Sequence, residues 1–163
     1  VTEVVLFGWL NRREICWDIF DAVVGSSAIQ GLLPRRFNTL SGGEQQRVQF
    51  ARALLQLHSS NDELTGKYML LDEPTSNLDI AHGLHMLSLL KQVVSHGVGA
   101  AVVLHDLNLA ARFADTVMLL HHGKVVRSGS VEHVFNEDIF TDVYGTKIYV
   151  ERHDSLNRLV VHS

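Results

Sequence analysis

The chain has 163 residues, of which 46% are apolar and 20% charged, a mixture typical of a globular protein with a hydrophobic core. Its longest apolar runs fall far short of the roughly 18 to 20 residues that a membrane-spanning helix needs. The formal net charge of -4 argues against a nucleic-acid-binding surface, which needs an excess of basic residues. A single cysteine, Cys16, excludes an internal disulfide.

The ten histidines do not have the spacing of a metal site. His121 and His122 fall at the tip of a predicted hairpin, and His82 and His85 fall on a predicted helix without a third ligand. Solvated surface histidines are therefore the favoured interpretation.

Two helical segments are predicted in the first part of the chain. Apolar residues within residues 1–39 recur loosely at helical intervals. A second helix is predicted over residues 41–57, because Ser41 and Glu44 have the spacing of a capping box and apolar residues then recur on one face. A polar loop is predicted at residues 58–67.

Strands then alternate with helices. Residues 68–71 and 100–104 are predicted as buried strands, and residues 79–95, with an inner stripe beginning at Ile80, as the long helix between them. The remaining predicted elements are a helix, a hairpin, two short helices and two strands, at residues 106–114, 116–128, 131–135, 139–144, 148–150 and 159–162. The alternation favours a parallel α/β sheet with helices on both faces. In such sheets the functional residues lie beyond the carboxyl ends of the strands.

Three side chains suited to acid–base or phosphate chemistry follow the two predicted strands. Asp72 and Glu73 end the first strand, and His105 follows the second. An acidic turn and a core histidine are the plain alternatives. The functional interpretation is a Walker B element, in which Asp72 helps to hold Mg²⁺ and Glu73 orients and deprotonates the water that attacks a γ-phosphate.

The turn before the helix at residues 41–57 is suited to bind an anion. Gly42 and Gly43 expose backbone N–H groups at the helix N-terminus, where the helix dipole adds partial positive charge. Ser41 can cap the helix and also donate to a phosphate oxygen. An ordinary capped helix start is the alternative.

In combination, these motifs follow one another in an order that resembles the ABC ATPase family. Residues 40–45 resemble its signature motif, residues 69–76 its Walker B strand, residues 76–79 its D-loop, and His105 its switch histidine. The resemblance implies a P-loop-NTPase-like ABC ATPase domain, with a parallel sheet core and a helical signature subdomain. Residues 1–58 would be the helical subdomain, and residues 59–163 the C-terminal part of the catalytic core and the tail.

In that family two ATPase domains enclose two ATP molecules between them. The resemblance implies that the signature residues contact ATP held by a second copy of the subunit, that D-loop residues communicate across the dimer, that Asp72 serves Mg²⁺, and that Glu73 and His105 are catalytic. The signature residues are Ser41, Gly42, Gly43 and Glu44, and the D-loop residues are Ser76, Asn77, Leu78 and Asp79. Two departures are that Glu44 stands where glutamine is commonest and that Asn77 replaces a frequent alanine.

A phosphate-binding loop of the form Gly-x-x-x-x-Gly-Lys-Ser/Thr does not occur in the sequence. We therefore expect the chain to be the C-terminal part of a longer subunit, with the phosphate loop and the Q-loop glutamine preceding Val1. By itself the chain is expected to be inactive as an ATPase. A truncated remnant that hydrolyses nothing is the alternative.

Among ABC ATPases, the sequence resembles most the subunits of iron-siderophore, cobalamin and haem importers. The long loop at residues 58–67 and the tail from Arg152 resemble the haemin-importing members, with siderophore or cobalamin import as the alternative because loops and tails vary freely. The resemblance implies ATP and Mg²⁺ as cofactors and a homodimer bound to a permease dimer on the cytoplasmic face of a bacterial inner membrane. A periplasmic substrate-binding protein would act indirectly, and no nucleic acid is expected. A soluble ABC protein acting on DNA or ribosomes is the competing class.

Overall fold

The computed structural model describes residues 1–9, 14–58 and 64–163. The chain divides into two compact units, Val1–Val103 and Leu104–Ser163, which are described separately. The subdomain boundary predicted near residue 58 stays a prediction. Residues 59–63, within the loop that suggested haemin, lie outside the described residues.

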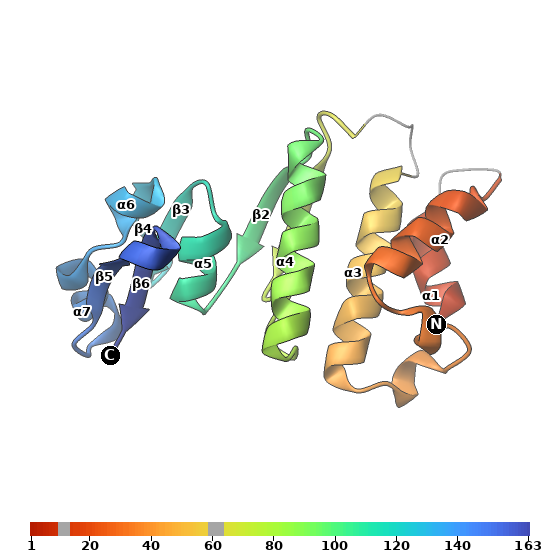
Figure 1. Ribbon diagram of the computed structural model, residues 1–163, viewed down its shortest axis with the longest axis horizontal. Coiled ribbons are helices and arrows are strands. Elements are labelled where there is room, and N and C mark those ends of the chain that lie inside the picture. The colour runs from red at the N-terminus through yellow and green to blue at the C-terminus, as the bar shows by residue number, and fades with distance from the viewer. Residues whose placement is uncertain (10–13, 59–63) are drawn as a thin grey trace. The chain divides into compact units, whose positions relative to one another are not determined.

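The first unit opens with helices that pack on one long helix (Figure 1). Helices α1 and α2 both contact α3, whose predicted apolar face is buried. The helical elements and turns of this part are α1 (Thr2–Leu6), η1 (Phe7–Trp9), α2 (Trp17–Ser26), η2 (Gln30–Leu32), η3 (Phe37–Thr39) and α3 (Gly42–His58). The capped helix predicted at residues 41–57 is therefore present.

The rest of the first unit is a parallel β–α–β segment. Strands β1 (Tyr68–Asp72) and β2 (Gly99–Val103) pair in parallel, and helix α4 (Ile80–Ser95) connects them and contacts β2. The predicted parallel pairing is confirmed. At its carboxyl end Asp72 lies opposite Val103, and the backbone N–H of Glu73 extends the pairing by donating to the Val103 carbonyl at 3.1 Å.

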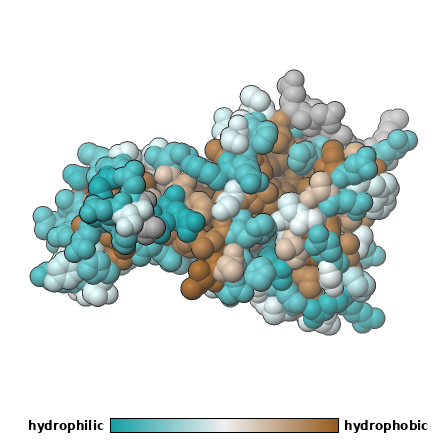
Figure 2. All heavy atoms as spheres, in the orientation of Figure 1, coloured by the Kyte–Doolittle hydropathy of each residue, from teal (hydrophilic) through white to brown (hydrophobic). Residues whose placement is uncertain are grey.

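The prediction of fully buried strands is wrong for this sheet. Met69 is buried, but Tyr68 and Leu70 on the opposite side of β1 are 77% and 81% exposed. Alternate residues of a strand point to opposite faces, and here only one face is covered. Ile80, predicted on the inner stripe of α4, is also exposed, and apolar residues appear at the surface at that end of the helix (Figure 2).

The second unit combines short helices with two antiparallel hairpins. Its elements are α5 (Leu107–Phe113), β3 (Val117–His121), β4 (Lys124–Gly129), α6 (Val131–Val134), α7 (Glu137–Tyr144), β5 (Tyr149–His153), η4 (Asp154–Leu156) and β6 (Arg158–His162). Strand β3 pairs with β4, and β5 with β6. The core of this unit consists of Leu119, Val131, Val134, Phe135, Phe140 and Ile148.

Helix α5 is hydrogen-bonded to strand β6 through the side chain of Asn108. The amide of Asn108 donates to the Val161 carbonyl at 2.9 Å, and its carbonyl oxygen accepts from the Val161 N–H at 2.8 Å. Because both backbone groups of Val161 are satisfied in this way, Asn108 pairs with β6 as a neighbouring strand would. Within the described ranges no helix combines the length and apolarity required to cross a bilayer.

Candidate functional site

The signature turn is built by a reciprocal capping box at the start of α3. The backbone N–H of Ser41 donates to Glu44 Oε2 at 2.7 Å, and the backbone N–H of Glu44 donates to Ser41 Oγ at 3.3 Å. This geometry confirms the Ser-x-x-Glu pattern predicted from the sequence. The capping box thus fixes Ser41, Gly42 and Gly43 at the N-terminus of α3, where the backbone N–H groups of the first helical turn are located.

Glu44 is also paired with a cation that sequence reasoning missed. Arg35 Nη1 lies 2.7 Å from Glu44 Oε1, and Arg35 Nη2 donates to the Thr39 carbonyl at 3.1 Å. The pKa of the Glu44 carboxyl is lowered, chiefly by the hydrogen bond from the Ser41 backbone and further by Arg35. The acidic residue that replaces the usual glutamine is therefore ionised and neutralised locally.

The D-loop lies directly against the signature turn of the same chain. A Cβ atom at Gly43 would be 2.6 Å from the Asn77 carbonyl oxygen and 3.4 Å from the side chain of Leu78. Only glycine permits this approach without displacing backbone. Gly42 is less confined, since a Cβ there would meet the Asn77 side chain at 3.5 Å. The two motifs, separated by more than thirty residues in sequence, are thus in contact.

Asp72 and Glu73 lie at the carboxyl end of β1, which is the end of parallel strands at which ligands usually bind. Asp72 is exposed and Glu73 half-buried. Glu73 has a φ of 45°, in the left-handed region that non-glycine residues rarely adopt. Its carbonyl accepts hydrogen bonds from the backbone N–H of Ser76 at 3.2 Å, from Ser76 Oγ at 3.1 Å and from Gln46 Nε2 at 3.1 Å.

Asp79, the last predicted D-loop residue, is the N-cap of α4. Its carboxylate accepts from the His82 backbone N–H at 2.8 Å and lies 2.8 Å from His82 Nδ1. The pKa of Asp79 is lowered, mainly by that backbone hydrogen bond. The structure thus gives Asp79 a local capping role, and its communication across a dimer stays a prediction.

His105 belongs to the second unit and lies two residues beyond β2, with an exposed side chain. The next residue, Asp106, caps α5 by accepting from the backbone N–H groups of Asn108 and Leu109 at 2.8 and 3.1 Å. The predicted catalytic role of His105 stays a prediction.

The carboxylates fit a magnesium ion that is shared with a substrate. Magnesium is bound in nucleotide enzymes by one or two carboxylates together with substrate phosphates and water, without a complete protein cage. The described part of the chain has no group of three or more His, Cys, Asp or Glu side chains placed to hold a metal. The exposed carboxylate of Asp72 supplies an oxygen ligand of the right kind.

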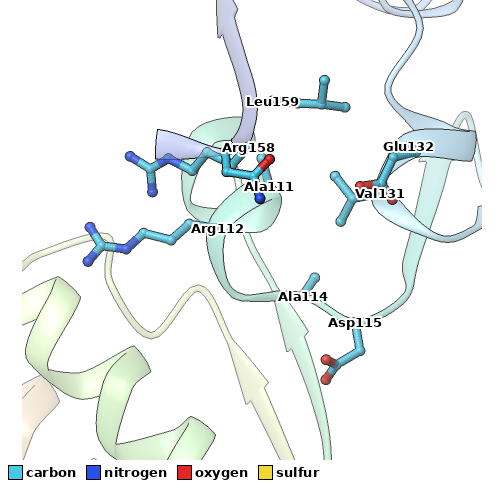
Figure 3. Close-up of a pocket in the computed structure, with 9 residues that line it drawn as sticks. Ala111, Arg112, Ala114, Asp115, Val131, Glu132, Arg158 and Leu159 are labelled. Carbon is cyan, nitrogen blue, oxygen red and sulfur yellow. The ribbon is translucent and has the colours of Figure 1, made fainter. Parts of the chain in front are cut away.

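A hollow of about 550 Å³ lies in the second unit, and none of the predicted site residues lines it (Figure 3). Its lining contains two basic residues, Arg112 and Arg158, and two acidic residues, Asp115 and Glu132. Figure 3 shows both arginine side chains extending to the side away from Glu132. This balance favours no particular class of ligand.

No family model matches the chain. The chain nevertheless has the fold of solved ABC transporter cassettes. Among solved structures, it is similar to an inward-facing transporter of metal-chelate ABC type, with a TM-score of 0.75 and 22% identity over 99% of this chain and 64% of that one. It is also similar to a dimeric bacterial ABC transporter cassette, with a TM-score of 0.65 and 29% identity over 78% of this chain and 54% of that one.

Curated relatives of the chain include proteins described as hemin import ATP-binding proteins. The chain is 48% identical to a hemin import ATP-binding protein of Enterobacter cloacae, over 75% of this chain and 48% of that protein. It is 41% identical to the protein of the same description from Deinococcus radiodurans, over 96% of this chain and 60% of that protein. The chain therefore spans about half to three fifths of the length of these relatives.

Proposed function

We propose that the protein containing this sequence is the ATP-hydrolysing subunit of an ABC importer that transports haemin. The observation that carries the ATPase assignment is the contact between the Gly42–Gly43 turn and Asn77, together with the carboxylates at the end of β1. The similarity to hemin import ATP-binding proteins across most of the chain supports haemin as the substrate.

In this proposal the site residues act on ATP in two ways. The Ser41–Gly42–Gly43 turn, with Glu44, binds the phosphates of an ATP molecule held by a second copy of the subunit, through backbone N–H groups and the Ser41 hydroxyl. Glu73 is the general base, accepting a proton from the attacking water, and His105 donates to a γ-phosphate oxygen. The D-loop residues Ser76 to Asp79 connect the two sites.

Asp72 holds Mg²⁺, which neutralises charge on the phosphates. The partners in this proposal are a second copy of the subunit and a permease dimer, supplied by a periplasmic binding protein. The subunit would lie on the cytoplasmic face of a bacterial inner membrane. The solved ABC cassette dimer to which the chain is similar supports the homodimer.

The test is reconstitution of the complete subunit with its neighbouring permease in lipid vesicles. ATP hydrolysis is measured with haem-loaded binding protein and, in parallel, with siderophore-loaded binding protein. We expect stimulation by the haem-loaded protein. The Glu73→Gln variant should keep ATP binding and lose turnover by about 10²- to 10⁴-fold, because its amide cannot accept the proton of water.

The two parts of the proposal fail separately in this experiment. Stimulation by the siderophore carrier alone would reject haemin while leaving the ATPase assignment intact. Near wild-type hydrolysis by Glu73→Gln would reject Glu73 as the base, whichever substrate is transported.

A further inference from the structure

We propose that Gln46 is a positioning residue for the catalytic base, linking the signature helix to the Glu73 turn of the same subunit. This proposal rests on the proposed function, because it takes Glu73 to be the base. Gln46 lies one turn beyond the signature glycines on α3, and its side-chain amide donates to the Glu73 carbonyl at 3.1 Å.

The Glu73 backbone needs such support. Its φ of 45° belongs to the left-handed region, which is sterically unfavourable for a non-glycine residue. Residues held in such conformations persist only where surrounding contacts determine them. At Glu73 the backbone N–H is held by the Val103 carbonyl, and the carbonyl is held by Ser76 and Gln46.

Gln46 differs from the other partners of Glu73 in where it comes from. Val103 belongs to the neighbouring strand and Ser76 to the same turn, whereas Gln46 belongs to the helix that carries the signature motif. The half-buried position of Gln46 shields its hydrogen bond from competition with water. Displacement of the start of α3 would therefore be transmitted to the backbone of Glu73.

The contact between Gly43 and the D-loop connects the Gln46–Glu73 hydrogen bond with the proposed ATP-binding turn. Gly43 and Gln46 are three residues apart, so they lie on the same face of α3. One meets the D-loop backbone at Asn77 and the other meets the Glu73 carbonyl. Binding of the signature turn to the partner's ATP and the placement of the base at the subunit's own ATP are thus coupled through one helix face.

The test compares variants of the complete subunit. Gln46→Met removes the amide donor at nearly constant length, and Gln56→Met makes the same change on the exposed side of α3, ten residues further on. We expect Gln46→Met to lower kcat about tenfold with little change in the KM for ATP, since one misplaced group at the reacting centre affects the transition state more than ground-state binding. Gln56→Met should stay within about twofold of wild type.

A double-mutant cycle with Glu73→Gln separates positioning from general stability. If Gln46 acts through Glu73, Gln46→Met will cause no further loss in the Glu73→Gln background. Hydrogen exchange at the Ser76 amide, which also donates to the Glu73 carbonyl, should be faster in Gln46→Met than in Gln56→Met. Gln46→Glu, which keeps the shape without the donor, serves if the methionine variant does not fold.

Equal kcat in Gln46→Met and Gln56→Met would overturn the positioning role. An equal loss in both the Glu73 and the Glu73→Gln backgrounds would also overturn it. If Glu73→Gln by itself leaves turnover intact, the catalytic assignment fails first, and that outcome is distinct from a failure of Gln46 alone.

Discussion

Replacing Gly43 by alanine tests the contact between the signature turn and the D-loop. A helical glycine replaced by alanine usually stabilises a helix by roughly 1 kcal/mol. At Gly43 the new Cβ would be 2.6 Å from the Asn77 carbonyl oxygen, so we expect the opposite sign. Gly43→Ala should destabilise the protein by about 1 to 3 kcal/mol, measured by denaturant unfolding.

Gly42→Ala is the matched control, because its Cβ would lie 3.5 Å from the Asn77 side chain, an ordinary contact. Its stability should equal or exceed that of the wild type. If both variants unfold at the same denaturant concentration, the D-loop does not lie against the signature turn as described.

The Glu44 carboxylate predicts a pH dependence of stability. Its pKa is below the ordinary value of 4.5, first because the Ser41 backbone donates to it and then because Arg35 lies beside it. The ionised group therefore stabilises the fold above pH 4.5, and this contribution is lost as the pH falls through the lowered folded-state pKa. Glu44→Gln, which keeps the capping box but loses the charge, should be less stable than wild type at pH 7.

Denaturant midpoints at pH 7 and pH 3 measure this difference. The gap between wild type and Glu44→Gln should shrink at the lower pH, where the wild-type carboxyl becomes protonated. In an Arg35→Met background the gap at pH 7 should be smaller, since the ion pair is already absent. A gap that widens on acidification would contradict the assignment.

Among the secondary-structure elements, β6 is hydrogen-bonded to α5 through Asn108. Each hydrogen bond contributes about 0.5 to 1.5 kcal/mol, so Asn108→Ala should destabilise the second unit by roughly 1 to 3 kcal/mol. Hydrogen exchange of the Val161 amide should accelerate, because its acceptor is the Asn108 side chain.

Asn108→Asp separates the two bonds. Aspartate can still accept from the Val161 N–H but cannot donate to its carbonyl. Protection of the Val161 amide should therefore survive in Asn108→Asp and not in Asn108→Ala. Equal exchange in wild type and alanine variant would mean that β6 is held by other contacts.

For the whole 163-residue chain, we expect weak ATP binding and no turnover. The reason is the absence of a Gly-x-x-x-x-Gly-Lys-Ser/Thr loop, whose backbone and lysine make most of the phosphate contacts in this class of enzyme. Equilibrium dialysis with labelled ATP and Mg²⁺ provides the measurement. Micromolar binding with magnesium-dependent hydrolysis by the chain alone would contradict this expectation.

Local pattern was sufficient to predict most elements and the positions of the candidate site residues on them. The capping box at Ser41 and Glu44, the carboxylates ending β1, and the parallel pairing of β1 with β2 all follow from short-range spacing and strand alternation. Such features depend on residues within a few positions of one another, whose geometry the backbone imposes. The order of the motifs along the chain was itself enough to indicate the family.

Only the tertiary structure could show which distant groups meet. Three contacts join residues that are 27 to 53 positions apart: Gly43 lies beside Asn77, Gln46 donates to the Glu73 carbonyl, and Asn108 pairs with Val161 of β6. No local pattern specifies such contacts. The burial of β1 was mispredicted for the same reason. An apolar run shows that a strand favours burial, but exposure depends on which elements cover each face, as the exposed Tyr68 and Leu70 demonstrate. The sequence therefore determined the elements and where the candidate site residues fall on them, whereas packing between distant segments decided how the candidate site is held together.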